Sequence, residues 1–373
     1  MTHVFVVDKN TLKYHLEYLF AGTGAKDKLS PFLGTPSIDY NSTTERMLVE
    51  LIADISRIRI GDKVIFYLQT VDGNPGMFFG VFKVKSKPFF DENDAGNYLV
   101  NYTNKGLSFR VLLEKDEVYA KGVTEHEYLD SLKGKNKPYD LCWSLIYRKL
   151  KGNRGCTMIM DYEFDDLLMK LRSKNNKKVL SGDAFTFDTT TFEISCIDVV
   201  KPYLGRKDKL DILPRLLYKA NQEKAFESHL QAYIMQNFEL INNLIPMKKC
   251  PVWIGNEVSC GVGMQRIDVM IMQESKNDVY IRLIELKDEP PYIEIIMNQL
   301  PWYLEWLSYY ILPRYSKKQV HVIPTIIGEG QIPNSISPEY RNFSYPIPGV
   351  YVKKLEYFGF ETTPKTINFK QYL

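Results

Sequence analysis

The stretch "RIDVMIMQESKNDVYIRLIELK", residues 266–287, decides the fold of the C-terminal half of the chain. Two apolar runs, "IDVMIM" and "VYIRLIEL", have the length of buried strands, and the polar segment "QESKND" between them is typical of a turn. We expect the two runs to pair as an antiparallel hairpin. Asp268, at the start of the first strand, would then lie beside Glu285, at the end of the second.

Charged side chains at that end of the hairpin form a candidate metal site. Lys287 lies two residues after Glu285, so an extended strand points both side chains to the same face. Carboxylate and carbonyl oxygens are the ligands that Mg²⁺ prefers, and the carbonyl of Leu286 is a further candidate. Glu227, at the border of the apolar face of the helix predicted over 222–241, would add a third carboxylate. An ammonium group there can orient a water and offset negative charge in a transition state. Hydrolysis of a phosphodiester at neutral pH needs a divalent metal, and Asp268 and Glu285 are placed to hold Mg²⁺; a solvated strand edge is the alternative.

A glutamine on the next predicted helix, within "EIIMNQLPWYLEWLSYYIL", is a candidate orienting group. Gln299 shares a face with Tyr303 and Trp306, and an amide on a core-facing stripe needs a polar partner. Pro301 follows at once, so we expect this helix to be kinked or to start late.

The order of the predicted elements indicates the fold class. After residue 210 the order is helix, strand, strand, strand, helix, strand, which implies a mixed sheet flanked by helices. Residues beyond 327 are typical of additional strands. Near the N-terminus, "GDKVIFYLQTVDGNPGMFFGVFKV" predicts a hairpin around "DGNPG". The polar run "SKNNKKVLSGD" favours a boundary, and "AFTFDTTTFEISCIDVV" either closes the first domain or bridges to the second. We therefore predict domains at 1–172 and 221–373, connected by 173–220.

The C-terminal motifs resemble the PD-(D/E)XK nuclease superfamily, and within it the catalytic domains of archaeal mismatch-type endonucleases. The helix glutamate, "GVGMQRID", "IELK" and "NQLPWYLEWL" follow in the family's order over about residues 221–327. The resemblance implies a restriction-endonuclease-like mixed sheet and cleavage of DNA that depends on Mg²⁺ or Mn²⁺. It implies a metal held by Asp268, Glu285 and Leu286, and the catalytic residues Asp268, Glu285, Lys287, Glu227 and Gln299.

Residues 1–172 resemble the PUA-like β-barrel group that includes EVE and YTH domains, on the strands "HVFVVD", "GDKVIFYLQ" and "GMFFGVFKV". The resemblance implies a β-barrel with helices that binds nucleic acid and takes a modified base into an aromatic pocket. Extruding a base costs a few kcal/mol, which stacking and edge hydrogen bonds recover. The candidates for this pocket are Tyr40, Asn41, Trp143 and Ser144. For Tyr40 and Trp143, packing in the barrel core is an alternative at least as strong.

The run "IYRKLKGNRG" is a candidate contact for backbone phosphates. Its four cations have little acidic compensation, which suits a polyanion. A solvated basic loop is the alternative. The cations are Arg148, Lys149, Lys151 and Arg154.

Composition limits the other classes of function. The chain has 373 residues, a formal net charge of +3 and five cysteines without a CxxC pair, so neither a disulfide framework nor a zinc ribbon is indicated. It contains no signal-peptide pattern and no run of about 18 apolar residues. We expect a cytoplasmic protein without a membrane span.

These observations predict a modification-dependent restriction endonuclease with DNA as its partner. Because each such site cuts one strand, cleavage of both strands favours a homodimer. Two alternatives stay open: a repair or structure-specific endonuclease, and a nucleic-acid reader with an inactive nuclease fold.

Overall fold

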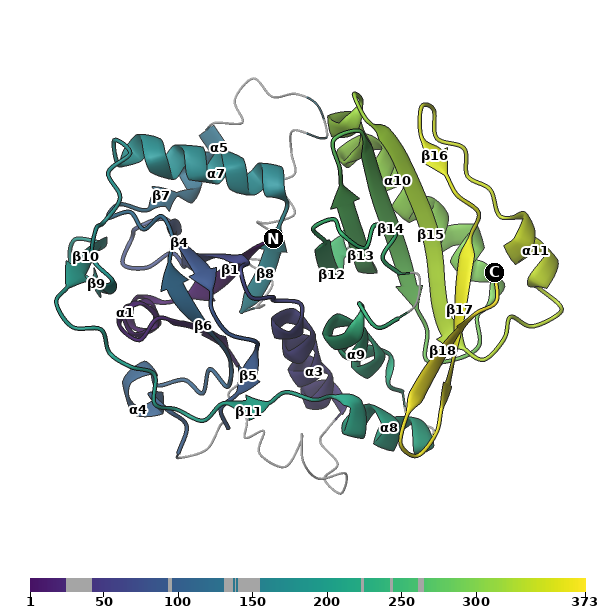
Figure 1. Cartoon of the computed structure of the whole chain (residues 1–373), viewed down its shortest axis with the longest axis horizontal. Coiled ribbons are helices and arrows are strands. Elements are labelled where there is room, and N and C mark those ends of the chain that lie inside the picture. Colours follow the sequence, from purple (N-terminus) through teal and green to yellow (C-terminus); the bar gives the residue numbers. More distant parts are fainter. Residues whose placement is uncertain are drawn as a thin grey trace. The chain divides into compact units, whose positions relative to one another are not determined.

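The computed structural model describes residues 1–24, 42–92, 96–130, 137, 139, 155–222, 225–241, 244–260 and 265–373. These residues form two compact units, drawn mainly in purple to teal and in green to yellow in Figure 1. The first comprises 1–130 and 155–210, and the second comprises 211–373 with Lys137 and Tyr139. The division falls within the segment 173–220, and residues 173–210 belong to the first unit. The predicted mixed α and β fold class is confirmed, because each unit is a sheet with helices.

The sheet of the second unit has the strand order β12-β13-β14-β15-β17-β18, and β16 pairs with β15. The pairs β12–β13, β13–β14 and β17–β18 are antiparallel, whereas β14–β15 and β15–β17 are parallel. Figure 1 shows β14, β15 and β17 side by side, with α10 behind them. The predicted order of helix, three strands, helix and strand is confirmed, as are additional strands after residue 327. The elements are α8 (Leu213–Asn221), α9 (Glu227–Asn237), β12 (Trp253–Ser259), β13 (Arg266–Glu274), β14 (Asp278–Leu286), α10 (Leu300–Tyr310), β15 (Gln319–Glu329), α11 (Ser337–Asn342), β16 (Tyr351–Val352), β17 (Glu356–Thr362) and β18 (Ile367–Gln371).

Helix α10 begins with an irregular turn, as Pro301 leads one to expect. Residues Ile295–Gln299 form a π-helical turn, and α10 continues from Leu300 with the proline in its first turn. Proline donates no backbone N–H, and its ring clashes with the preceding turn of a regular helix. The wider π-turn relieves that clash, and each extra residue rotates the following side chains by about 100° around the helix axis.

The first unit is built on a nine-stranded sheet of order β11-β5-β6-β4-β3-β1-β8, with β2 paired to β6 and β7 paired to β4. Strands β3 and β4 form the predicted antiparallel hairpin. Asp72 and Gly73 both have positive φ at its tip, as the favoured two-residue hairpin turn requires. The elements are β1 (Thr2–Val7), α1 (Lys9–Glu17), β2 (Phe20–Thr23), α3 (Ser42–Ser56), β3 (Lys63–Leu68), β4 (Met77–Val84), β5 (Phe89–Phe90), α4 (Val100–Thr103), β6 (Phe109–Lys115), β7 (Val123–Thr124), α5 (Glu125–Asp130), β8 (Cys156–Ile159), α7 (Asp161–Lys174), β9 (Ala184–Asp188), β10 (Glu193–Ile197) and β11 (Asp208–Lys209).

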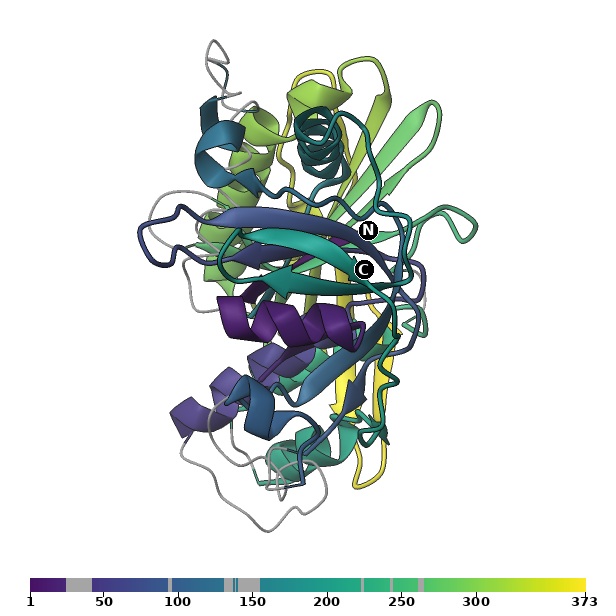
Figure 2. The same cartoon turned by 90° about the vertical axis from the view of Figure 1, so that its left-hand side faces the viewer.

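The run after residue 183 closes the first unit. Strands β9 and β10 pair as an antiparallel hairpin, and Figure 2 shows α1, in purple, lying along it. Phe185 packs edge-on against Phe82 of β4, with ring centroids 6.0 Å apart. Phe187 packs in the same way against Phe79, at 5.5 Å. The open choice between closing the first domain and bridging to the second is therefore resolved in favour of the first domain.

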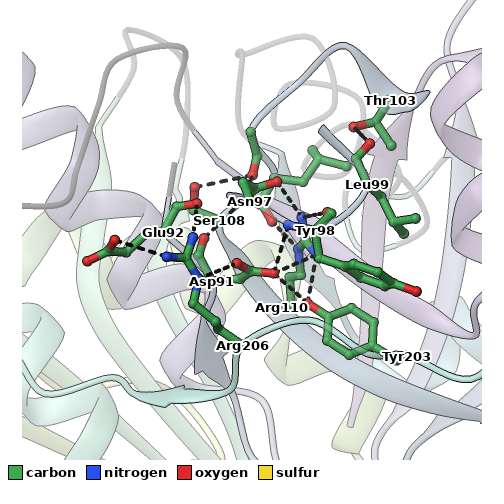
Figure 3. Close-up of polar contacts among 12 residues, drawn as sticks. Asp91, Glu92, Asn97, Tyr98, Leu99, Thr103, Ser108, Arg110, Tyr203 and Arg206 are labelled. Atoms are coloured by element: carbon green, nitrogen blue, oxygen red, sulfur yellow. Dashed lines mark hydrogen bonds and ion pairs between the residues drawn. The ribbon is translucent and has the colours of Figure 1, made fainter. Parts of the chain in front are cut away.

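A buried ion pair ties the segment after β10 into the first unit (Figure 3). Arg110 of β6 is fully buried and uses every guanidinium N–H. Its Nη1 donates to Asp91 Oδ2 at 3.1 Å and to the Tyr203 hydroxyl at 2.6 Å. Its Nη2 donates to Asn97 Oδ1 and the Tyr98 carbonyl, and Nε donates to the Leu107 carbonyl. Because Tyr203 also donates to Asp91 at 2.9 Å, residue 203 is anchored to the sheet.

Two histidines are buried in the core of the first unit. The ring of His15 stacks on Phe66 at 5.3 Å and meets Phe20 edge-on at 4.7 Å, and neither ring nitrogen has a hydrogen-bond partner among the described residues. Burial lowers the pKa of His15 to about 3. Burial also lowers the pKa of His3 to about 4, although Asp62 partly opposes it across a 2.8 Å contact.

We expect the free energy of unfolding of the first unit to fall as the pH drops below 6.5. The unfolded histidines take up protons near pH 6.5 and the folded ones only near pH 3–4, so the unfolded state binds more protons in this window. At pH 5 the loss relative to pH 7 is about 2 kcal/mol for each histidine. Urea unfolding at pH 5 and at pH 7 measures this loss of unfolding free energy. His15→Leu is expected to remove about half of the loss, and an unchanged loss in that variant would contradict the assignment.

Candidate active site

The pairing of β13 with β14 brings the two predicted metal carboxylates together. The register runs from Glu274–Val279 to Val269–Ile284, so Asp268 and Glu285 are the next residues of the two strands. Asp268 Oδ2 accepts the backbone N–H of Leu286 at 2.7 Å. The predicted hairpin and the predicted proximity of the two residues are confirmed.

The ammonium of Lys287 lies between two carboxylates, on the face predicted for it. Its Nζ is 2.7 Å from Glu285 Oε1 and 3.4 Å from Glu227 Oε2. Burial by itself would lower the pKa of Lys287, but Glu285 and Glu227 together raise it above its usual range. An ammonium group held in this way is suited to binding an anion.

Asp288 positions Glu227, although nothing in the sequence indicated this role. Its Oδ2 accepts the backbone N–H of Phe226 at 2.6 Å and that of Glu227 at 3.0 Å. A carboxylate at the N-terminus of a helix satisfies free N–H groups and interacts favourably with the helix dipole. The charged residues at the end of β14 and just after it thus have two roles: Glu285 and Lys287 enter the site, and Asp288 anchors the helix that carries the third carboxylate.

The site holds more negative than positive charge. Burial raises the pKa of Asp268 well above its ordinary value, and the carboxylates of Glu285 and Glu227 raise it further. Burial likewise raises the pKa of Glu227, where Glu285 and Asp288 add to the effect and Lys287 opposes it. An additional cation would relieve this repulsion.

Asp268→Asn is expected to stabilise the cation-free protein. A raised pKa means that the ionised carboxylate is disfavoured in the folded state, so at neutral pH its charge costs stability. Asparagine keeps an oxygen for the Leu286 N–H and removes the charge. The melting temperature of the second unit, measured in EDTA, should rise by roughly 2–4 °C for each kcal/mol of repulsion relieved. Glu361→Gln, on an exposed position of β17, is the matched control and should not change it; a lower melting temperature for Asp268→Asn would contradict the expectation.

The donor set fits a hard divalent cation. Mg²⁺ is commonly held by one or two carboxylates and retains several waters. Asp268 and Glu285 supply such a pair, and Glu227, on the other side of the Lys287 ammonium, fits as a donor through water. Across the described ranges, no three His, Cys, Asp or Glu side chains gather closely enough to enclose an ion. The carbonyl of Leu286 stays a predicted ligand.

On α10 it is Tyr303 that contacts the site. The Tyr303 hydroxyl lies 2.7 Å from Glu285 Oε2 and 2.9 Å from the Arg266 carbonyl. Gln299 lies in the π-turn, and its Oε1 is buried and accepts no hydrogen bond from a described residue. No contact described by the structure joins Gln299 to Asp268 or Glu285, so its orienting role stays a prediction.

Gln231 is a further residue at the site that the sequence did not single out. It lies one helical turn after Glu227 on α9, and its Nε2 is 3.0 Å from both Glu257 Oε1 and the Asp268 carbonyl. Glu257 of β12 also pairs with Arg266 at 2.9 Å. These contacts fix α9 against β12 and β13. The spacing of four residues from Glu227 was the only signal that could have found Gln231.

The remaining predicted residues lie outside the described part of the chain. These are the candidates for the modified-base pocket and for phosphate contacts, and both assignments stay predictions. They are Tyr40, Asn41, Trp143, Ser144, Arg148, Lys149, Lys151 and Arg154.

Comparison with known proteins gives structural similarities at low identity. No family model matches the chain, and no curated protein matches it. A structure of the human THYN1 protein in complex with DNA containing 5-methylcytosine is 11% identical and covers 45% of this chain and 96% of its own, with a TM-score of 0.26. The DUF55 domain of human thymocyte nuclear protein 1 is 10% identical, with coverages of 46% and 98% and a TM-score of 0.27. A hypothetical protein from Leishmania major is 13% identical, with coverages of 47% and 97% and a TM-score of 0.29. All three TM-scores lie below 0.5, so the fold is taken from the chain's own strands and helices.

None of the helices in the described ranges is long and apolar enough to cross a membrane.

Proposed function

We propose that the second unit is a metal-dependent nuclease that hydrolyses phosphodiester bonds in DNA. The observation that carries the proposal is the group formed at the end of β14. Two carboxylates from paired strands lie beside a charged lysine, with Lys287 Nζ 2.7 Å from Glu285 Oε1 and Asp268 bound to the intervening Leu286 N–H. A structural ion pair between Lys287 and Glu285 would not need Asp268 and Glu227 beside it, and burial together with the charges of Glu285 and Glu227 raises the pKa of Asp268.

Each residue of the group has a task in this reaction. Asp268 and Glu285 would hold Mg²⁺ or Mn²⁺, and when bound the cation would offset charge on the phosphate oxygens and favour deprotonation of water. The Lys287 ammonium, beside Glu285, can bind a phosphate oxygen or orient the attacking water. Glu227, held by Asp288, keeps the ammonium beside Glu285.

In the same proposal, the first unit selects the DNA by binding a modified base. This part rests on the resemblance of residues 1–172 to PUA-like domains and on the strand and helix content of that unit. We further propose that two copies act together, since one site cuts one strand.

Cleavage of matched DNAs tests the proposed function. Purified protein is incubated with Mg²⁺ or Mn²⁺ and phage DNAs that are unmodified, methylated or hydroxymethylated, with EDTA as the control. Cutting confined to modified DNA supports the whole proposal. Cutting of unmodified branched or mismatched DNA would favour a structure-specific endonuclease instead. Binding to DNA without cleavage of any substrate would overturn the nuclease assignment.

A further inference from the structure

Tyr303 is the only side chain among the described residues for which the structure gives a hydrogen bond to Glu285 Oε2. Both side chains are almost fully buried, with Tyr303 4% and Glu285 2% exposed. The hydroxyl has one proton and two acceptors in range, the Glu285 carboxylate at 2.7 Å and the Arg266 carbonyl at 2.9 Å. A charged carboxylate is the stronger acceptor, so the proton is donated to Glu285.

The two oxygens of Glu285 therefore accept hydrogen bonds from different donors. Oε2 is held by the neutral hydroxyl of Tyr303 in α10, whereas Oε1 is held by the ammonium of Lys287 at 2.7 Å. The phenol of Tyr303 carries its proton at neutral pH and lies 2.7 Å from Oε2, so it acts as the donor. A cation can reach Glu285 by displacing the ammonium from Oε1, without disturbing Oε2.

The helix that carries Tyr303 places it, and not Gln299, at the site. Gln299 is the last residue of the π-turn, and its side-chain Oε1 is buried and accepts no hydrogen bond from a described residue. Tyr303 lies in the regular part of α10 and contacts Glu285.

We propose that Tyr303 is a positioning residue that holds Glu285 by Oε2 and presents Oε1 alone as the ligand atom for the divalent cation. The proposal rests on the proposed function of the site. Without the phenol, Glu285 is free to turn both oxygens toward Lys287, and a cation must then break a stronger ion pair.

The test compares Tyr303→Phe with Tyr357→Phe, which removes a hydroxyl that is buried in the same unit and bonded to backbone carbonyls at 3.1 and 3.3 Å. Binding of Mn²⁺ is followed by electron paramagnetic resonance, and cleavage is measured over a range of Mn²⁺ concentrations. Loss of a group that orients a ligand typically weakens metal affinity 10- to 100-fold. For Tyr303→Phe we expect affinity about 10-fold weaker and half-maximal cleavage at a correspondingly higher Mn²⁺ concentration. For Tyr357→Phe we expect both to be unchanged.

Two outcomes would overturn the proposal. Wild-type affinity for Mn²⁺ in Tyr303→Phe would show that the hydrogen bond does not position the ligand, and would leave the proposed nuclease intact. An equal loss in both variants would assign the effect to general destabilisation. If the wild type itself binds no Mn²⁺, the proposed function fails as well, which distinguishes that result from the other two.

Discussion

Glu285→Gln is expected to lower the rate of DNA cleavage by about 10³-fold or more while leaving the protein folded. Glutamine has the same shape and retains an oxygen for the Tyr303 hydroxyl, but it cannot supply negative charge to a cation or to Lys287. Charge stabilisation by a bound cation contributes several kcal/mol, and each 1.36 kcal/mol is about tenfold in rate. Single-turnover cleavage measures the effect, with thermal unfolding as the check on folding.

Glu289→Gln is the matched control for this experiment. Glu289 belongs to the same charged run, but its side chain is exposed. We expect it to cleave at the wild-type rate. Equal rates for Glu285→Gln and the wild type would contradict the assignment of Glu285, whatever the control shows.

Asp91→Asn is expected to destabilise the first unit by about 3–5 kcal/mol, the usual cost of leaving a buried charge without its partner. Asp91 and Arg110 are both fully buried, and Asp91 also accepts hydrogen bonds from Tyr203 and Arg206 (Figure 3). The amide retains the size of the carboxylate but not its charge, so Arg110 keeps its neutral partners only. Urea unfolding followed by a probe in the first unit measures the change.

A surface ion pair provides the comparison. Asp72 pairs with Lys9 at 2.6 Å, and both side chains are exposed to solvent, at 58% and 35%. Asp72→Asn should therefore cost at most about 1 kcal/mol. If the two variants unfold at the same urea concentration, the buried network does not stabilise the unit as described.

The parts of the site that depend on local sequence were predictable. Apolar runs of strand length and the polar turn between them are short-range signals. The β13–β14 hairpin therefore followed from "RIDVMIMQESKNDVYIRLIELK". The position of Asp268 beside Glu285 and the shared face of Glu285 and Lys287 are consequences of that register. The same holds for the β3–β4 hairpin and its turn.

The contacts that position the carboxylates were not predictable in this way. Asp288 binds the start of α9 across 61 residues of sequence, and Gln231 binds the Asp268 carbonyl across 37. Nothing in the local pattern of either segment encodes its partner. Pro301 signalled an irregular helix, but the sequence did not show that Tyr303 would contact Glu285.

The buried network of the first unit also depends on contacts between residues far apart in the sequence. The sequence favours 173–220 as a connection because its first residues are polar, yet Tyr203 and Arg206 complete an ion pair with residues about 100 positions earlier. A polar, glycine-containing segment can be a linker or a part of the core, and only its partners decide between the two.

Binding of Mn²⁺ to the wild type and to Glu285→Gln, followed by electron paramagnetic resonance with and without a DNA oligonucleotide, tests the central claim most directly. The account predicts saturable binding to the wild type that is lost or strongly weakened in the variant. If all Mn²⁺ remains free in the wild type even with DNA present, or if the variant binds it equally well, the carboxylates at the end of β14 are not a metal site.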